Sequence, residues 1–486
     1  MKDFFDQNEV LRVLQGFNPW WQGRSLRVPP FKRLAYFAAR RHLDDPSLHR
    51  AILLSGPRRV GKTTILSQVA ADLVGEGTEP ASVLYLSLDH PLLKLVRLER
   101  ILRTYHENVY PEGKPATLLL DEIQYSAEWQ LELKQLVDHR PNYHLLATGS
   151  ASLVHQRGIA DTGVGRWVRL TVPTLSFYEF LQIRGETPEG VPETLRPVDL
   201  LDKTDAELSG LAAQFRGVEP PFLRYLLVGG FPETAQQPDL ALCQRLLRED
   251  VVERVLKRDM AALFGVRNVN DLERLFIYLC LHSGGIIAVK TCADALGTLP
   301  ATVSNHLELL REANLIYRVG PYETSGKKVL KARYKIYLVD AALRNAVLLR
   351  GEQVLADPQE MGVMVETAVF RHLYSYYYRD TPETLYWRDP TSDKEVDIIV
   401  RSPSYTIPVE VKYRESAPLS EDSGLVAFCR SQQPYHAFWV TRREDDFGTR
   451  QFAGTKTRFL QIPAHIFLYL VGQAERLQWE KSTIGR

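Results

Sequence analysis

Residues 56–64 read Gly56-Pro57-Arg58-Arg59-Val60-Gly61-Lys62-Thr63-Thr64, which matches the phosphate-binding loop pattern G-x-x-x-x-G-K-[ST]. The glycines of such a loop let the backbone turn tightly, so that its N–H groups face phosphate oxygens. Lys62 reaches the β- and γ-phosphates, and the Thr63 hydroxyl binds Mg²⁺. An apolar run at 51–54 and a helical pattern at 65–74 flank the loop in strand–loop–helix order. All the residues of the loop are therefore predicted to bind ATP.

A second apolar run, residues 116–120, ends in Asp121-Glu122. A buried strand with acidic residues at its tip is the expected companion of a phosphate-binding loop. We expect Asp121 to hold Mg²⁺, directly or through water, and Glu122 to polarise the water that attacks ATP. The alternative is that Asp121 caps the amino terminus of the next helix.

Two more polar positions are predicted to belong to the same site. A third strand, at 144–147, ends in Thr148-Gly149-Ser150, where either Thr148 or Ser150 is placed to sense the γ-phosphate. Arg166 follows a glycine-containing turn and is a candidate for an arginine finger that acts on the ATP of a neighbouring subunit. The alternative is a surface arginine in a loop.

Length and composition fit a protein of several domains. A chain of 486 residues is too long for one core, and 45% hydrophobic with 24% charged residues is ordinary for globular proteins. The net charge of +1 means that any nucleic-acid surface must be local. The four cysteines lack C-x-x-C spacing, so they predict neither a zinc site nor a disulfide framework. We found neither an apolar run of membrane-spanning length nor a signal peptide, and therefore expect a cytoplasmic protein with no membrane partner.

The segment 289–338 follows the order of a helix-turn-helix with a wing. Helical patterns at 289–296 and 301–313 precede two strand patterns, at 316–319 and 334–338. The second helix and the hairpin carry the side chains that we predict to contact DNA, namely Thr302, Ser304, Asn305, His306, Lys327, Lys328, Lys331 and Arg333. The alternative is a packing module of the ATPase with a solvated basic loop.

Two strand patterns near the end of the chain contain Asp397 and Glu410-x-Lys412, which together form the PD-(D/E)xK nuclease pattern. Glu410 and Lys412 share one strand face, and Asp397 lies on the neighbouring strand. With Glu366 from a preceding helix, Asp397 and Glu410 are predicted to bind Mg²⁺ or Mn²⁺ for phosphodiester hydrolysis. Lys412 is predicted either to position the attacking water or to neutralise charge in the transition state. The alternatives are a hairpin with solvent-facing charges and a degenerate fold that only binds DNA.

These features resemble the AAA+ ATPases, and more narrowly a prokaryotic family in which an AAA+ domain precedes a domain of unknown function with a nuclease-like fold. The resemblance covers most of the chain. Besides the phosphate-binding loop and the acidic motifs at 397–412, it rests on Asp121-Glu122-Ile123-Gln124, Thr148-Gly149-Ser150, Leu175-Ser176-Phe177-Tyr178-Glu179-Phe180 and Gly229-Gly230-Phe231-Pro232-Glu233. It implies an α/β fold and identical subunits that assemble, with a hexameric ring as the expected form.

The resulting domain prediction is an arm at 1–48, an AAA+ ATPase domain at 49–200, a helical and winged-helix domain at 201–348, and a restriction-endonuclease-like α/β domain at 349–486. The favoured function is an ATP-hydrolysing enzyme that acts on DNA, such as branched, single-stranded, replication or repair intermediates. The alternative is a signal-transducing ATPase switch that binds a protein partner and uses a degenerate nuclease fold for docking. A nuclease whose ATPase only gates cutting is a third hypothesis. RNA is not distinguished from DNA, because phosphate contacts carry no sequence information.

Overall fold

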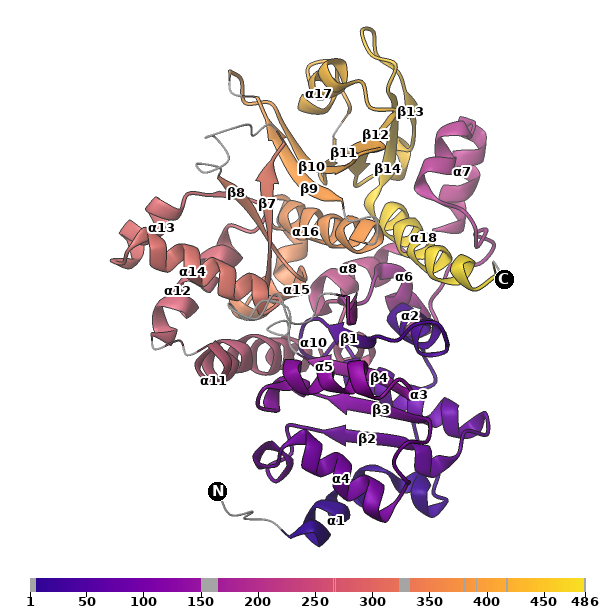
Figure 1. The fold of residues 1–486 in the computed structure, drawn as a ribbon. Coiled ribbons are helices and arrows are strands. Elements are labelled where there is room, and N and C mark those ends of the chain that lie inside the picture. The colour runs from indigo at the N-terminus through magenta and orange to yellow at the C-terminus, as the bar shows by residue number, and fades with distance from the viewer. Residues whose placement is uncertain are drawn as a thin grey trace. The chain divides into compact units, whose positions relative to one another are not determined.

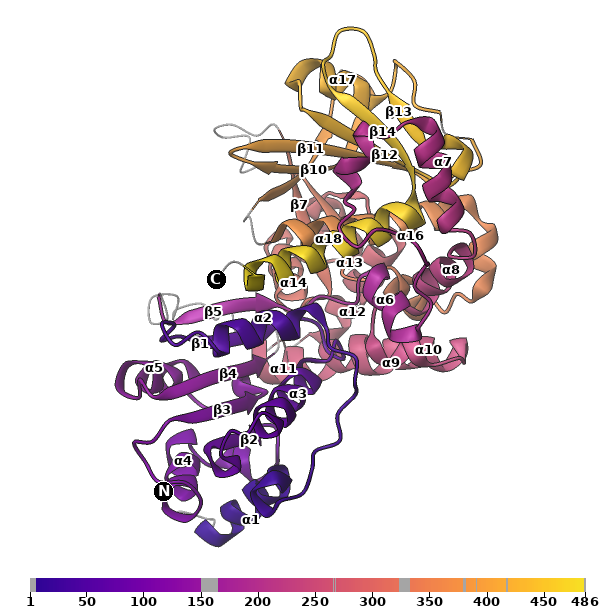
Figure 2. The same cartoon turned by 90° about the vertical axis from the view of Figure 1, so that its right-hand side faces the viewer.

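The computed structural model describes residues 6–149, 165–264, 266, 268–322, 333–378, 382–389, 391–416 and 418–484. The chain divides into two compact units, Met1–Pro173 with Trp479–Arg486, and Thr174–Gln478. The division after residue 173 lies before the predicted boundary at 200, and the predicted boundary at 348 lies inside the second unit. Each unit is built on a sheet of its own (Figures 1 and 2).

The first unit is a parallel sheet connected by helices, which confirms the predicted α/β alternation. Its described strands pair in the order β2-β3-β4-β1-β5, and every neighbouring pair is parallel. The strands are β1 (Ala51–Ser55), β2 (Val83–Ser87), β3 (Ala116–Asp121), β4 (Tyr143–Gly149) and β5 (Trp167–Thr171). The α-helices are α1 (Gln7–Phe17), α2 (Leu34–Leu43), α3 (Lys62–Gly75), α4 (Leu98–Asn108) and α5 (Trp129–His139). Because parallel strands end at one edge, the residues that follow β1, β3 and β4 can share a site.

Helices cover both faces of this sheet. Leu53 of β1, Leu86 of β2 and Leu120 of β3 lie in one buried cluster with apolar side chains of α1, α4 and α5. The helix α2 contacts β1, β4 and β5, and α3 contacts β2, β3 and β4. Burial on both faces explains why the strands read as continuous apolar runs in the sequence, and not as an alternating pattern.

The second unit is built on a longer mixed sheet, whose described strands pair in the order β13-β14-β12-β11-β10-β9-β7-β8-β6. The strands are β6 (Ile286–Ile287), β7 (Ile316–Pro321), β8 (Tyr334–Leu338), β9 (Glu383–Arg388), β10 (Glu395–Ser402), β11 (Tyr405–Lys412), β12 (His436–Thr441), β13 (Gly448–Arg450) and β14 (Arg458–Pro463). The α-helices are α6 (Phe177–Arg184), α7 (Asp205–Gln214), α8 (Glu219–Val228), α9 (Pro232–Gln236), α10 (Leu240–Leu246), α11 (Met260–Phe264), α12 (Val269–Leu281), α13 (Val289–Leu296), α14 (Pro300–Glu312), α15 (Ala342–Val347), α16 (Pro358–Tyr377), α17 (Gly424–Gln432) and α18 (Ala464–Ile484). A π-helical segment, Leu247–Asp259, joins α10 to α11.

The hairpin β7–β8 is part of the same sheet as the carboxy-terminal strands. Gly320 and Pro321 of β7 pair in parallel with Leu385 and Tyr386 of β9. The helices α16 and α17 contact β10 and β11 from opposite sides of the sheet (Figures 1 and 2). The two predicted domains on either side of residue 348 therefore share one sheet.

Two of the motifs behind the family resemblance contact each other in the second unit. The Leu175 N–H donates to the Gly230 carbonyl at 2.5 Å, and the Gly230 N–H donates to Asp340 Oδ2 at 2.9 Å. The Tyr225 hydroxyl donates to the Leu175 carbonyl at 2.9 Å. The two motifs therefore stabilise the second unit through contacts with each other, and these contacts are structural.

Replacing Gly230 by alanine is expected to lower the free energy of unfolding of the second unit by about 3 kcal/mol, because the new side chain collides with backbone. A Cβ atom at Gly230 would lie 2.4 Å from the Leu175 oxygen and 2.7 Å from the Leu175 nitrogen. Urea unfolding followed by hydrogen exchange of α16 peptides measures the effect. Gly210→Ala in α7 is the matched control, since a Cβ there meets no atom within 4 Å. Equal stability of the two variants would contradict the prediction.

A buried imidazole predicts a pH dependence of stability. The Phe177 N–H donates to His372 Nε2 at 2.8 Å, and His372 Nδ1 lies 2.7 Å from the Ala368 carbonyl, so the neutral ring satisfies both contacts. Burial, followed by the nearby Arg371 charge, holds the pKa of His372 well below its usual value. Below about pH 6.5 the His372 imidazole binds a proton in the unfolded chain but stays neutral in the folded chain. The free energy of unfolding therefore falls as the pH falls.

The expected slope from His372 is about 1.4 kcal/mol per pH unit below pH 6.5. In His372→Gln, the fall in stability between pH 6.5 and 5 should be shallower by that amount, as measured by urea unfolding at each pH. Burial also lowers the pKa of His465 and of His436, each to about 4, so part of the slope remains in the variant. Identical slopes in the two proteins would show that His372 titrates normally.

Candidate nucleotide site and carboxylate cluster

The phosphate-binding loop follows β1 and leads into α3, as the sequence predicts. Gly56 has no room for a side chain, since a Cβ atom there would lie 2.1 Å from the Val172 oxygen. Gly61 has φ +95°, a left-handed conformation that favours glycine. Gly56 therefore allows close contact with the backbone of Val172, and Gly61 allows the left-handed turn before α3.

Residues of the amino-terminal arm form hydrogen bonds with the phosphate-binding loop and with α3. The buried Arg33 guanidinium donates to the carbonyl of Val60, at 2.8 Å, and to that of Pro173, at 2.7 Å. The Gln68 amide of α3 donates to the carbonyls of Pro29 and Phe31. The arm thus fixes the loop against α3 and the end of β5.

The tips of β1, β3 and β4 bring the predicted ligands together. The Thr63 hydroxyl donates to Asp121 Oδ2 at 2.9 Å, and the Thr148 hydroxyl donates to Asp121 Oδ1. The Tyr85 hydroxyl of β2 also donates to Asp121 Oδ2, at 3.2 Å. The Lys62 ammonium donates to the carbonyls of Gly56, at 2.9 Å, and Pro57, at 2.8 Å. Tyr85 could not be assigned to this site from the sequence, because only the pairing of β2 with β3 brings it next to Asp121.

Asp121 is only 3% exposed, and its charge depends on these hydroxyl donors. Burial raises the pKa of Asp121 above its usual value, and the Glu122 charge adds to this, while the hydrogen bonds from Thr148 and Thr63 oppose it. A cation placed beside the carboxylate would favour its ionised form. The arrangement is therefore suited to a bound cation.

Glu122 stands at the tip of β3 in a left-handed conformation, with φ 54°. Its N–H donates to the Thr148 hydroxyl at 3.0 Å, and its carboxylate accepts from the Gln124 amide. Thr148 therefore contacts both acidic residues. Ser150 lies outside the described residues.

Arg166 lies just before β5, at the end of the sheet where the parallel strands begin. Its carbonyl accepts from the N–H of Ala51, the first residue of β1, whereas the phosphate-binding loop follows the last residue of that strand. The length of β1, about 16 Å, separates the two positions. The Arg166 side chain pairs with Asp138 at 2.8 Å. Arg166 is therefore too far away to act on ATP bound to its own loop.

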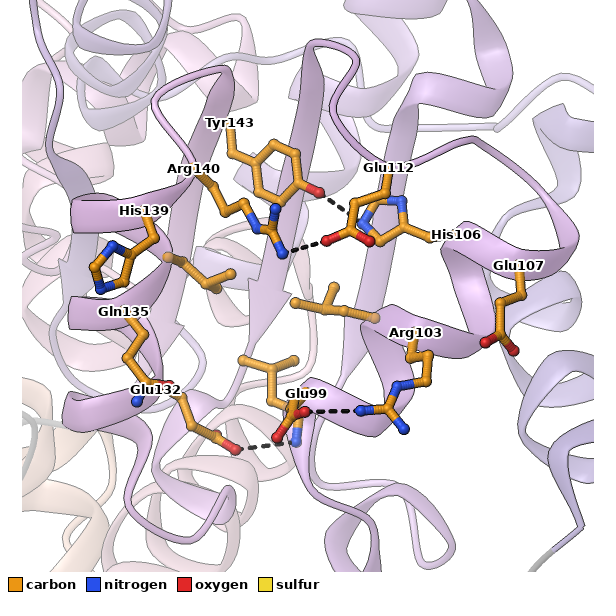
Figure 3. A pocket seen from close by; sticks show the side chains of 13 residues that line it. Glu99, Arg103, His106, Glu107, Glu112, Glu132, Gln135, His139, Arg140 and Tyr143 are labelled. Atoms are coloured by element: carbon orange, nitrogen blue, oxygen red, sulfur yellow. Dashed lines mark hydrogen bonds and ion pairs between the residues drawn. The ribbon is translucent and has the colours of Figure 1, made fainter.

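A separate pocket of about 480 Å³ opens between α4 and α5 (Figure 3). Two pairs of its charged side chains bond to each other, Arg103 with Glu99 and Arg140 with Glu112. The Tyr143 hydroxyl lies 2.7 Å from His106 Nε2. Tyr143 begins β4, whereas the nucleotide ligands stand at the ends of the strands, so this pocket is distinct from the predicted ATP site.

The second unit brings the nuclease-pattern residues together on β10 and β11. The Asp397 N–H donates to Glu410 Oε2 at 3.2 Å, and the Val411 N–H donates to Asp397 Oδ2 at 3.0 Å. The Lys412 ammonium pairs with Glu410 Oε1. Glu366 of α16 accepts from the Tyr337 hydroxyl at 2.7 Å. The structure therefore brings together the side chains that the sequence predicts to share one site.

A lysine ammonium lies among these carboxylates, where the sequence predicts a metal ion. Lys335 of β8 is 2% exposed, and its Nζ lies 2.9 Å from Glu366 Oε1, 3.0 Å from Glu395 Oε1 and 2.9 Å from Asp397 Oδ1. Across the described part of the chain, no group of three histidine, cysteine, aspartate or glutamate side chains is arranged to hold a metal ion. Of the carboxylates predicted to bind Mg²⁺ or Mn²⁺, Glu366 and Asp397 contact the Lys335 ammonium, and Glu410 pairs with Lys412. A lysine inside the apolar strand 334–338 was the available signal, since buried charges need partners.

Protonation of the cluster follows its burial and its charges. Burial raises the pKa of Asp397, but the Lys335 and Lys412 charges outweigh it and hold this pKa below its usual value. Burial, followed by the Asp397 charge, raises the pKa of Glu410 to about 8. Burial and Asp397 also raise the pKa of Glu366. The cluster therefore ionises at Asp397 first.

The residues predicted to contact DNA divide into three groups. Ser304 and Asn305 of α14 are exposed and Thr302 is half-buried, while Arg333 is exposed just before β8. His306 was expected on the exposed face of α14 but is only 6% exposed, because helical spacing turns it toward the core beside Val303 and Leu307. Burial lowers the pKa of His306. Lys327, Lys328 and Lys331 lie outside the described residues.

The remaining sequence expectations concern cysteines and membranes. Cys243, Cys280, Cys292 and Cys429 are all described, and all are buried free thiols. Within the described ranges, no helix combines the length and the apolar composition that crossing a bilayer requires.

Comparison with protein families gives a match to the AAA domain over residues 48–181. Residues 220–354 match a domain of unknown function (DUF8612), and residues 361–464 match a second domain of unknown function (DUF4143). The first match covers the phosphate-binding loop and the strand tips described above.

Among curated proteins, an uncharacterized protein of Methanocaldococcus jannaschii is 28% identical over 332 residues, covering 67% of this chain and 68% of that protein. An uncharacterized protein of Haemophilus influenzae is 25% identical over 380 residues, covering 77% of this chain and 85% of that protein. Among solved structures, the RuvB Holliday junction branch migration motor of Thermotoga maritima is 15% identical, with 64% of this chain and 88% of that chain covered at a TM-score of 0.26.

Proposed function

We propose that the AAA domain at residues 48–181 binds ATP with Mg²⁺ and hydrolyses it. The observation that carries this proposal is the meeting of the Thr63 hydroxyl, the Asp121 carboxylate and the Thr148 hydroxyl beside the phosphate-binding loop. Phosphoryl transfer requires a cradle for the phosphates, a site for the metal and a group that orients water, and the three strand tips offer all of them.

The residues present fit Mg²⁺, because a hydroxyl and a carboxylate oxygen converge to 2.9 Å from two elements of one site. Thr63 and Asp121 would hold the ion, which supplies positive charge to the phosphate oxygens when bound. Lys62 would bind the β- and γ-phosphates, and Thr148 would keep the Asp121 carboxylate oriented. Glu122 would polarise the attacking water and accept its proton.

DNA is the ligand that we propose for the second unit. The order α12-β6-α13-α14-β7-β8 supports a winged helix, and the strands β9 to β12 between α16 and α17 support a restriction-endonuclease-like fold. Ser304, Asn305 and Arg333 present exposed groups of the kinds that contact phosphates and bases. ATP hydrolysis would drive or gate the engagement of branched, replication or repair intermediates.

Identical subunits that share their ATP sites are part of the proposal. Arg166 stands about one strand length from the loop of its own subunit, so an arginine finger at this position would serve a neighbour. A head-to-tail contact of this kind closes into a ring, and a hexamer is the expected form.

Steady-state ATP hydrolysis with a panel of nucleic acids tests the DNA proposal. The panel holds single strands, duplex, forks and four-way junctions at one moderate salt concentration, because phosphate contacts depend steeply on salt. Lys62→Ala is the blank. We expect one DNA structure to stimulate the rate strongly. A slow rate that no nucleic acid changes would remove the DNA-acting hypothesis.

The second candidate is an ATP-dependent switch that binds a protein partner. The observation that favours it is the ammonium of Lys335 among the carboxylates of the nuclease-like motif, which suits a docking fold better than a cutting one. A switch is expected to hydrolyse ATP slowly, to ignore DNA and to tolerate Arg166→Ala. Affinity purification in the ATP-bound and ADP-bound forms would then identify the partner.

A further inference from the structure

Lys335 pairs with three carboxylates of the cluster, whereas Lys412 pairs with one. Its ammonium carries three N–H donors and faces three carboxylate oxygens, one each from Glu366, Glu395 and Asp397, at 2.9, 3.0 and 2.9 Å. These distances are those of charge-assisted hydrogen bonds. All three donors of Lys335 are satisfied, and the side chain is almost completely buried.

The fourth carboxylate of the cluster is also paired. Glu410 accepts from the Asp397 N–H through Oε2 and pairs with Lys412 through Oε1. Asp397 Oδ2 accepts from the Val411 N–H, so both of its oxygens have partners. A divalent cation would need several of these oxygens at about 2.0–2.6 Å, and Lys335 Nζ occupies the space between them.

The Lys335 ammonium cannot be exchanged for a metal ion by a simple rotation of the side chain. β8 is paired on both sides, with β7 and with β6, and the neighbouring Tyr337 donates to the same Glu366 carboxylate. Moving Lys335 away would leave the buried Asp397 and the partly buried Glu366 and Glu395 without this ammonium, which is costly.

We propose that Lys335 is the resident cation of this cluster, so that the second unit keeps a nuclease-like motif without a divalent metal and uses it to fasten β8 to β10 and α16. With Lys335 in place, the residues do not fit Mg²⁺ or Mn²⁺ at this site. The wild-type chain therefore has no metal-dependent phosphodiesterase centre here. This inference is independent of ATP hydrolysis in the first unit.

Metal-dependent thermal stability tests the proposal in the full-length chain. Every protein carries Lys62→Ala and is measured without nucleotide, so that the ATP site does not contribute. We expect Lys335→Met to unfold roughly 5–10 °C below its Lys335 parent, because a buried cation is lost from its partners. Millimolar Mn²⁺ should restore much of this difference in Lys335→Met and should leave the parent unchanged.

Matched variants locate the effect. Lys412→Met removes the other lysine of the cluster and is expected to lower the unfolding temperature less, because Lys412 is one-third exposed and pairs with Glu410 alone among the described groups. Adding Asp397→Asn to Lys335→Met is expected to abolish the rescue by Mn²⁺. Absence of any rescue in folded Lys335→Met would overturn the proposal.

A second measurement covers the case in which Lys335→Met does not fold. Mn²⁺ binding to the Lys62→Ala parent is measured by electron paramagnetic resonance and compared with the same chain carrying Asp397→Asn. The proposal expects no difference between these two proteins. A Mn²⁺ site that Asp397→Asn removes would show that the metal displaces Lys335, and the proposal would be wrong.

Discussion

Glu122→Gln is expected to bind ATP as tightly as the unchanged protein and to hydrolyse it about 10²–10⁴-fold more slowly. Glutamine keeps the size of the side chain, and the Glu122 N–H still donates to the Thr148 hydroxyl. The amide, however, neither accepts a proton from water nor carries the charge that polarises it. Phosphate release measures kcat, and a fluorescent ATP analogue measures binding.

Glu128→Gln provides the matched control for this experiment. Glu128 undergoes the same chemical change on the same connection, has a similar left-handed φ of 56°, and is exposed at the start of α5. We expect its rate to equal that of the unchanged protein. If Glu122→Gln retained the full rate, the water-activating group would have to be a different residue.

Arg166→Ala is expected to lower hydrolysis about 10³-fold or more without loss of ATP binding, provided that the arginine serves a neighbouring subunit. The structure allows a sharper version of the experiment. A 1:1 mixture of Arg166→Ala and Glu122→Gln subunits should recover activity, because an intact Glu122 in one subunit meets an intact Arg166 from the next. Random mixing makes about a quarter of the contacts competent.

Asp138→Ala is the control for Arg166→Ala. Asp138 is the ion-pair partner of Arg166, so this variant removes the pair and leaves the guanidinium in place. An exposed pair of this kind contributes little to stability, and we expect a nearly unchanged rate. A mixture as inactive as its components would argue against a shared site, and a fully active Arg166→Ala would favour the switch.

The nucleotide site could be predicted from the sequence because its signals are local. The phosphate-binding loop occupies nine consecutive residues, and the strand before it is apolar on both faces, so neither depends on distant contacts. Asp121 could be placed for the same reason, since a strand tip is marked by the residue that ends an apolar run. The AAA domain match at 48–181 supports the predicted ATPase-like domain in this part of the chain.

The parts that could not be predicted depend on pairing between distant segments. Lys335 could not be linked to the carboxylate cluster, because the sequence does not show that β8 faces Glu366 and Asp397. His306 was assigned to an exposed face, although the helix turns it inward. The boundary at 348 was placed between two patterns whose strands β7 and β9 pair directly.

The position of the hairpin β7–β8 has a consequence for any nucleic acid that meets it. The two described strands of the hairpin lie inside the sheet, with β9 next to β7 and β6 next to β8. To swing outward, it would have to break backbone hydrogen bonds along both edges and the contacts of Lys335. If the second unit binds DNA as we propose, these strands would act as a fixed surface, and the DNA would have to change its shape to fit them. Such a surface would favour DNA that is already bent, branched or unstacked, because this DNA needs the least deformation energy to fit it.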